Sequence, residues 1–397
     1  MIYANYAATS PALSPAVVEE LRGYLEETHL NAGRNFEGLE AGTIALRARR
    51  AVAKLLGVAD PLRVIFSSGA TQSLNMAING LVREGDHVLA TSVEHNATAR
   101  PLESLRKSGV IELDWIQCDP DGSLDPEKIR SAIRKNTRLL VMPHGSNVLG
   151  TILPVTECFR IAHEYGVLTI LDMAQTGGIL PFTMEDYGAG NSMVSSAENS
   201  PTKVGVVNSD VVAFAGHKGL RGLAGTGGFA IGAAAAGQMR QWISGGTGSV
   251  SQSLDMPDFL PDKFEPGTQN TMGILSLAAS VEEILRTGVE TIRVRERAST
   301  ARFISGLGQI KKISVCGTLD PDRCVPVVSI VIPGKDAGEV SRFLFENHGI
   351  ITRSGLHCSP LAHQTAGTFP GGTVRFSFGS GTTEAEIDGI LEALDGV

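Results

Sequence analysis

Hydrophobic and polar positions alternate along the first part of the chain in a pattern that predicts short strands separated by helices. Short apolar runs that end in glycine or polar residues indicate buried strands, and apolar residues at helical spacing, as in 39–56, indicate helices. This alternation is typical of a mostly parallel sheet with helices on both faces. The predicted strands are 63–66, 87–91, 111–117, 138–142, 167–172 and about 210–215.

The segment before the first predicted helix is too short to be a domain. Ser14 and Pro15 suit the cap and first residue of that helix, because proline is tolerated where the backbone N–H has no partner. Further along, a second and smaller α/β pattern begins, with strands at 325–332 and 373–377 and a helix near 340–345. The expected division is an N-terminal arm at 1–14 that packs with the small domain, a large domain at 15–285, and a small C-terminal domain at 286–397.

One stretch of the large domain, 188–209, departs from this pattern because glycine, serine and asparagine are frequent in it. Such a composition is typical of a long loop inserted between two core strands. A disordered loop on the protein surface is the simpler interpretation, and a lid over an active site is the alternative.

Composition is that of an ordinary globular protein and excludes several functions. Hydrophobic residues make up 42% and charged residues 19% of the 397 residues. The formal net charge of −8 argues against a nucleic-acid partner, because polyanion binding draws on clustered lysine and arginine. No apolar run is long enough to span a membrane, and the N-terminal residues lack the basic start and apolar core of a secretory signal.

The cysteines are five in number and widely spaced, with no Cys-x-x-Cys motif. This spacing predicts neither a disulfide framework nor a metal site. A cytoplasmic protein with reduced thiols is therefore expected. The five are Cys118, Cys158, Cys316, Cys324 and Cys358.

Lys218 lies where the apolar strand at 210–215 gives way to a glycine-dense stretch that ends at Gly228. A lysine is almost never fully buried without a partner, and the neighbouring glycines leave room for a bulky group to bond its nitrogen. A Schiff base to pyridoxal phosphate is such a group. An isolated Gly-His-Lys is more often a surface turn, so this interpretation depends on the rest of the chain.

Polar residues follow the other predicted strands, at the edge where sheets of this kind bind ligands. Asp172 closes an apolar strand, where a carboxylate is costly unless a cation such as a protonated pyridine nitrogen meets it. The turn from Ser67 to Ser73 has small residues at a helix start, where backbone N–H groups can bind a phosphate. His95 and the turn at 143–150 follow two further strands.

Together these segments resemble the class V aminotransferase superfamily, which has fold type I of the pyridoxal-phosphate enzymes, and within it the cysteine desulfurase and selenocysteine lyase group. The resemblance covers nearly the whole chain, from 3–9, which is similar to the family's Asn-Ala-Ala-Thr signature, to 374–378. It implies an α/β fold with a large domain, whose mostly parallel sheet is flanked by helices, and a smaller C-terminal α/β domain.

The resemblance also implies a role for each matching residue. Lys218 would form the Schiff base and His95 would stack on the pyridine ring, both as catalytic residues. Asn147 and Arg353 would hold the substrate carboxylate, for which a guanidinium is well suited. The other cofactor contacts would be Gly69, Ala70, Thr71 and His217 at the phosphate, Asp172 at the ring nitrogen, Gln175 at the phenolic oxygen, and Thr268 at the phosphate of the neighbouring subunit of a homodimer.

Cys358 lies in Arg-x-Gly-x-His-Cys, which looks like the short-loop form of this group. A thiolate there could attack the substrate sulfur, and His357 and Arg353 could favour its charged form. A free cysteine more often serves as a small buried hydrophobic residue. Because polar and charged residues surround Cys358, the catalytic interpretation is favoured here, and the other four cysteines are given no role.

The leading hypothesis is a homodimeric cysteine desulfurase that converts L-cysteine to L-alanine, leaves the sulfur as a persulfide on Cys358 and can pass it to an acceptor protein. The alternatives are a selenocysteine lyase or other C–S lyase, a class V aminotransferase acting on another amino acid, and a non-catalytic scaffold, which the presence of Lys218 and Asp172 disfavours. Two features depart from the family. Ala215 stands where serine or threonine is common in the family. The insertion at 188–209 leaves the identity of the substrate undetermined.

Overall fold

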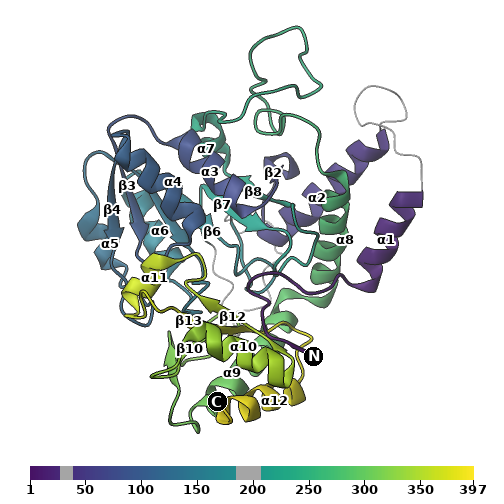
Figure 1. Ribbon diagram of the computed structural model, residues 1–397. Helices are drawn as coiled ribbons and strands as arrows, with labels where there is room; N and C mark the ends of the chain where they lie inside the picture. Colours follow the sequence, from purple (N-terminus) through teal and green to yellow (C-terminus); the bar gives the residue numbers. More distant parts are fainter. Residues whose placement is uncertain (27–38, 185–206) are drawn as a thin grey trace, which may run out of the picture.

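The computed structural model describes residues 1–26, 39–184 and 207–397 (Figure 1). Nearly all of the expected loop at 188–209 lies outside these ranges, so its interpretation stays a prediction. Within them, no helix is both long enough and apolar enough to cross a bilayer.

A seven-stranded sheet of order β2-β8-β7-β6-β5-β3-β4 forms the centre of the larger part of the molecule. Neighbouring strands from β7 to β4 run parallel, whereas β8 runs antiparallel to both β2 and β7. The prediction of a mostly parallel sheet is confirmed. The strands are β2 (Val64–Ser67), β3 (Asp86–Thr91), β4 (Ile111–Ile116), β5 (Thr137–Pro143), β6 (Leu168–Asp172), β7 (Val211–Ala215) and β8 (Gly227–Ile231).

Both faces of this sheet are buried along β6, β7 and β8, which explains why these strands are mostly apolar. Successive residues of a strand point to opposite faces, so Leu140 and Met142 of β5 join one core while Leu139 and Val141 join the other. The first core is completed by α2 (Leu39–Leu56), α6 (Val155–Glu164) and α8 (Thr271–Thr287), and the second by α3 (Ala70–Leu81), α4 (Asn96–Lys107) and α7 (Ala233–Gln238). The predicted helix at 39–56 is confirmed, as is the helix start at Pro15, because α1 spans Pro15–Glu26.

Strand β8 was not predicted, because it lies in the glycine-dense stretch after Lys218. Its glycines are required by packing. A Cβ on Gly228 would collide with the Ile65 carbonyl oxygen of β2, and a Cβ on Gly227 would lie 2.6 Å from the Cα of Gly69. Glycine therefore lets β8 enter the sheet between β2 and β7 and approach the turn that follows β2.

The smaller part of the molecule is an antiparallel sheet of order β12-β13-β10-β9, which lies below the large sheet in Figure 1. It has its own apolar core, in which Phe303 packs against Phe376 and Phe378. The N-terminal strand β1 (Ile2–Tyr3) pairs in parallel with β11 (Ile350–Ile351), so the start of the chain lies against this part. The domain boundaries stay predictions. The other elements here are α9 (Val289–Leu307), β9 (Ser314–Cys316), β10 (Val327–Val331), α10 (Ala337–His348), β12 (Arg353–Gly355), β13 (Thr373–Ser377) and α12 (Glu384–Asp395). Helix α11 (Pro360–Thr365) lies between β12 and β13 in the sequence and packs through Ala362 into a core of the large sheet.

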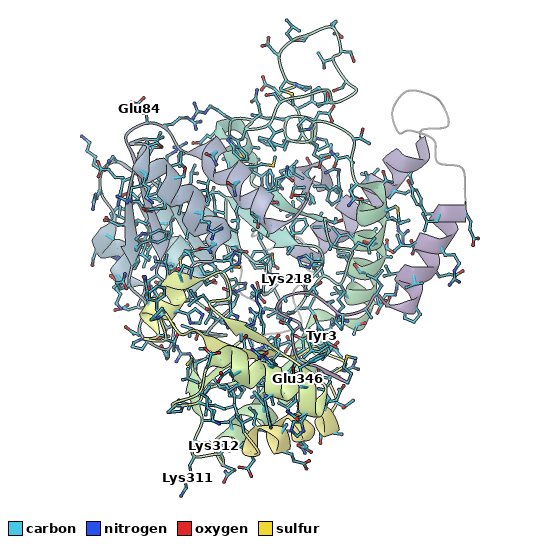
Figure 2. All side chains as sticks on the ribbon, viewed as in Figure 1. Tyr3, Glu84, Lys218, Lys311, Lys312 and Glu346 are labelled. Carbon is cyan, nitrogen blue, oxygen red and sulfur yellow. The ribbon has the colours of Figure 1, made fainter. Side chains whose placement is uncertain are left out.

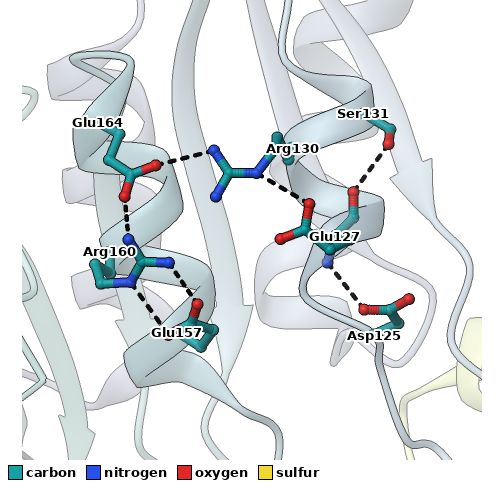
Figure 3. A network of polar contacts seen from close by, with 7 residues as sticks. All are labelled: Asp125, Glu127, Arg130, Ser131, Glu157, Arg160 and Glu164. Atoms are coloured by element: carbon teal, nitrogen blue, oxygen red, sulfur yellow. Dashed lines mark hydrogen bonds and ion pairs between the residues drawn. The ribbon is translucent and has the colours of Figure 1, made fainter.

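Two groups of ion pairs differ in their solvent exposure. Arg49 of α2 and Glu265 are both buried, and Arg49 Nη1 lies 2.8 Å from Glu265 Oε1. An exposed chain of pairs joins α5 (Glu127–Ala132) to α6, where Arg130 and Arg160 both contact Glu164 (Figure 3). Water and salt screen the exposed pairs, whereas each member of the buried pair depends on its partner.

Replacing Arg49 with Met should lower the free energy of unfolding by about 3–5 kcal/mol, because Glu265 is then buried without its cation. Arg160→Met removes only exposed pairs and should leave the free energy of unfolding nearly unchanged. Urea unfolding curves of both variants and the unchanged protein measure the difference. Similar losses in the two variants would contradict the importance given to burial.

Candidate active site

A cavity of about 180 Å³ opens at the carboxyl ends of β2, β5, β6 and β7. Its walls include Lys218, which Figure 2 places near the centre of the molecule, between the large sheet and the smaller part. Because these strands are parallel, their ends bring residues from distant parts of the sequence to one edge. The expected site residues that line the cavity are Gly69, Ala70, Thr71, His95, Asn147, Asp172, Gln175, His217 and Lys218.

Lys218 and Asp172 are the oppositely charged groups of the cavity wall. Asp172 is buried at the end of β6, where its Oδ1 accepts a hydrogen bond from the Ala174 N–H at 2.8 Å. Burial raises the pKa of Asp172, and the Ala174 bond and the Lys218 charge act against that rise. Burial also lowers the pKa of Lys218 to about 8, although Asp172 favours the charged form. A minor fraction of the lysine amine is therefore uncharged near neutral pH, and this fraction grows as the pH rises toward 8.

The turn after β2 leads into the N-terminus of α3, where a phosphate is predicted to bind. Gly69 caps α3 with a φ of 149°, and the first backbone N–H groups of a helix have no acceptors within the helix. Ser67 Oγ lies 2.8 Å from Ser73 Oγ and accepts from the Gly69 N–H at 3.2 Å, which fixes the turn. A Cβ on Gly227 would lie 2.6 Å from the Cα of Gly69, so β8 packs directly against this turn. The helix start at Ala70 is therefore held with its amide groups at the cavity wall.

His95 is the N-cap of α4, and its Nδ1 accepts from the Ala97 N–H at 3.0 Å. Since Nδ1 is an acceptor, the proton of the neutral ring lies on Nε2. Burial lowers the pKa of His95 to about 4, and the positive charges of Lys218 and Arg353 add to this effect. A neutral ring in a fixed orientation suits the predicted stacking role.

The N-terminal arm holds the other side of the lysine loop. His217 Nδ1 lies 3.0 Å from Thr9 Oγ1, and Ser10 Oγ donates to the Lys218 carbonyl at 2.8 Å. Gln175 Nε2 donates to the Ala7 carbonyl at 3.1 Å. The arm therefore contacts both the smaller part of the molecule and the loop that carries Lys218.

Cys358 differs from the other four cysteines in exposure. It is exposed, whereas burial raises the pKa of Cys118, Cys316 and Cys324 to about 11 and that of Cys158 to about 12. Arg353 Nη2 donates to Cys358 Sγ at 3.5 Å. The prediction that His357 favours the charged form of the Cys358 thiol is wrong. Its ring is buried, and burial lowers its pKa to about 2, so the ring carries no charge near neutral pH.

Arg375 is a candidate functional residue that the sequence analysis missed. It lies in β13, is 1% exposed, and donates to the Asn147 carbonyl at 2.9 Å, while its Nε has no partner. Burial, followed by the charge of Arg353, lowers the pKa of Arg375 to about 9. Such a cation is stabilised by a bound anion. A charged residue inside a predicted strand is a signal that could have identified it.

Two of the expected site residues have other surroundings than the resemblance implied. Thr268 is exposed and does not line the cavity, in keeping with a role toward a second subunit, which stays a prediction. Asn147 lines the cavity, but its amide is hydrogen-bonded to residues on both sides of Cys358. No group of three or more metal-ligating side chains occurs among the described residues.

The residues of the cavity fit pyridoxal phosphate. A helix N-terminus for a phosphate, a buried carboxylate for a protonated ring nitrogen and a lysine with a lowered pKa line one space. Ala215 also lines this space, so the hydroxyl that is common at this position is absent.

The chain belongs to the class V aminotransferase family, whose model, described as "Aminotransferase class-V", matches residues 2–207 and 192–390. Members of this family are pyridoxal-phosphate enzymes. The chain is 31% identical over 401 residues to a "Probable cysteine desulfurase" of Methanothermobacter thermautotrophicus, covering 99% of this chain and 94% of the relative. It is 30% identical over 303 residues to a cysteine desulfurase of Escherichia coli, covering 75% of this chain and 68% of the relative.

Solved structures agree with this assignment. The apo structure of a cysteine desulfurase from Thermococcus onnurineus NA1 has a TM-score of 0.87 and 27% identity, and the match covers 100% of this chain and 94% of that one. The predicted family, α/β fold and enzymatic nature are confirmed.

The lowered pKa of Lys218 predicts how the protein takes up pyridoxal phosphate, since only an uncharged amine adds to an aldehyde. The rate of uptake by cofactor-free protein should rise with pH and level off above about pH 8, where the amine has lost its proton. Stopped-flow absorbance measures this rate. After borohydride reduction, mass spectrometry should find the cofactor on the unchanged protein and on the exposed control Lys335→Ala, but not on Lys218→Ala. Fixation on another residue would contradict the assignment.

Proposed function

We propose that the protein is a cysteine desulfurase that converts L-cysteine to L-alanine and leaves the sulfur as a persulfide on Cys358. The observation that carries this proposal is an exposed thiol beside Arg353 and within electrostatic reach of Lys218. Relatives named as cysteine desulfurases, similar over most of the chain, support it.

Bound pyridoxal phosphate supplies an electron sink at the substrate Cα. The first amide groups of α3 and His217 would bind its phosphate, and Asp172 would pair with its ring nitrogen. The neutral ring of His95 would lie against the pyridine ring, and Gln175 would reach the phenolic oxygen. These assignments rest on the cavity that the residues share.

Arg353 and Arg375 are the cations available for the substrate carboxylate. Each lies within electrostatic reach of Lys218, and their mutual repulsion is relieved when an anion binds between them. The amine of Lys218, which burial keeps partly uncharged, can then take the proton from the substrate Cα.

Sulfur transfer follows at Cys358. Its thiolate attacks the sulfur of the bound cysteine, so that an S–S bond forms and the substrate's C–S bond breaks. The electron pair of the broken bond stays with the carbon, which is protonated to give alanine. Cys358 becomes a persulfide, and no external oxidant or reductant is needed. The positive charge of Arg353 stabilises the attacking thiolate.

Replacing Cys358 with Ala should abolish alanine formation from L-cysteine while the cofactor's absorbance still changes when L-cysteine binds. The reason is that the substrate keeps its contacts with the cofactor and the two arginines but loses the sulfur-accepting thiol. Alanine assays and absorbance titrations measure the two effects. Cys316→Ala, which changes a half-buried thiol of β9, is the matched control and should retain activity.

Other class V activities give different outcomes in the same experiment. If Cys358→Ala makes alanine at the unchanged rate, the thiol has no catalytic role. If the unchanged protein produces pyruvate and ammonia from L-cysteine, it is a C–S lyase. A selenocysteine lyase would retain activity toward the selenium substrate in Cys358→Ala.

We further propose that the enzyme is a homodimer in which Thr268 contacts the phosphate bound by the partner subunit. Thr268→Ala should weaken cofactor retention by about 1.5–3 kcal/mol, the value of a hydrogen bond to a charged group. Thr291→Ala, which alters an exposed threonine of α9, is the control. Equilibrium dialysis measures retention, and sedimentation measures assembly. A monomer with full cofactor occupancy would exclude the shared site.

A further inference from the structure

The loop that carries Cys358 has a strained backbone. His357 and Cys358 both adopt left-handed conformations, with φ of 50° and 59°. Residues other than glycine are disfavoured in this region, so two in succession persist only where the surroundings hold them. Because the Cys358 side chain is exposed, the contacts that hold the loop come from its backbone and from the neighbouring side chains.

His357 is the buried neighbour that precedes the thiol. It is 2% exposed, and its Nε2 lies 3.0 Å from Oγ1 of Thr373, a fully buried residue of β13. Thr373 also pairs with Gly355, the last residue of β12. A single residue of β13 therefore contacts the chain at two positions just before Cys358.

The His357 ring also packs against His363 of α11. The two ring centroids are 5.5 Å apart, and His363 is fully buried. His363 is itself fixed, because its Nδ1 lies 2.7 Å from Thr368 Oγ1. The ring of His357 thus contacts both α11 and β13, the two elements that follow the loop in the sequence, and these contacts restrict its movement.

Loops of the large sheet contact the backbone of the same two strained residues. The Asn96 N–H at the start of α4 donates to the Cys358 carbonyl at 2.8 Å, and Asn147 Nδ2 donates to the His357 carbonyl at 2.9 Å. The geometry of both bonds depends on the conformation that the His357 ring helps to hold. The Asn96 amide can therefore report on that conformation.

We propose that His357 is a positioning residue for Cys358, and that its ring holds the thiol in place through Thr373 and His363. This inference rests on the proposed function, in which Cys358 accepts the sulfur. The role differs from the electrostatic one expected from the sequence, because the ring is buried against β13 while the thiol contacts Arg353. A thiol held in one place needs no search for the conformation from which it attacks the substrate sulfur.

Two substitutions of His357 separate the hydrogen bond from the backbone conformation. The amide of glutamine can take the place of Nε2, whereas the amide of asparagine lies near the place of Nδ1, which has no hydrogen-bond partner among the described residues. Asparagine is also among the residues that best tolerate a left-handed backbone. His357→Asn should lower kcat for alanine formation by roughly 10- to 100-fold, because the thiol is misplaced. His357→Gln should restore most of the loss.

A second pair of variants tests the partner of the ring. Thr373→Val removes the hydroxyl and should lower kcat, whereas Thr373→Ser keeps the hydroxyl and should not. The dissociation constant of L-cysteine, from the cofactor's absorbance, should stay within about twofold of the unchanged value in every variant, because attack and not binding is affected. Thr300→Val, which alters a buried threonine of α9, is the matched control.

Hydrogen exchange provides a readout that does not depend on activity. The Asn96 amide should exchange faster in His357→Asn and Thr373→Val than in the unchanged protein, because its acceptor is the Cys358 carbonyl. Its rate should stay unaltered in His357→Gln, Thr373→Ser and Thr300→Val. Amides of β10, in the same sheet as Thr373, should keep their rates in all variants, which separates a loosened loop from general destabilisation.

The outcomes distinguish this inference from the proposed function. Equal kcat in His357→Asn and His357→Gln, whether lowered or unchanged, would overturn the role given to the hydrogen bond. Weaker binding of L-cysteine with unaltered kcat and exchange would also overturn it. If the unchanged protein makes no alanine, the proposed function fails, but exchange at Asn96 still decides whether His357 holds the loop. If His357→Asn does not fold, the two Thr373 variants give both measurements.

Discussion

The molecule depends on one electrostatic constraint, which is that the carboxyl edge of its central sheet holds more positive than negative charge. Lys218, Arg353 and Arg375 lie within reach of one another there, with Asp172 as the opposing carboxylate. Burial lowers the pKa of Lys218 and of Arg375, so these cations are stabilised when anions join them. A phosphate, a substrate carboxylate and a thiolate are three such anions, and the proposed reaction brings all three to this edge.

Topology explains why these charges meet although they are far apart in the sequence. Strands β6 and β7 are parallel neighbours in which Asp172 pairs with Ala213, so Lys218 emerges beside the carboxylate. The two arginines come from β12 and β13 of the smaller sheet, which are also neighbours and pair Arg353 with Arg375. The N-terminal arm contacts both parts. The site is therefore complete only when the two sheets are correctly placed against each other.

Much of this arrangement could be predicted from the sequence, because apolar runs reveal strands and ligands gather at strand ends. The strand at 373–377 and the helix at 39–56 have the predicted bounds, and the expected cofactor residues of one chain share a cavity. Strand β8 was missed because close packing selects glycine there and removes the apolar signal. The hydrogen-bond partners of Asn147 and the neutral state of His357 arise from tertiary contacts. The spacing of residues along the sequence does not reveal such contacts. The predicted role of Thr268 involves a second subunit and stays a prediction.

Exposure alone does not explain why Cys358 would be the sulfur acceptor, since a thiol on a mobile loop reaches its target only part of the time. The backbone around it is instead held in a conformation that the chain would otherwise avoid, with buried neighbours on either side. Strain of this kind is tolerated because the surrounding hydrogen bonds fix the loop, and in the proposed reaction its benefit is a nucleophile already placed for attack. In the proposed reaction the same rigidity would confine the persulfide to the surface position of Cys358, so access by an acceptor would be the condition for turnover.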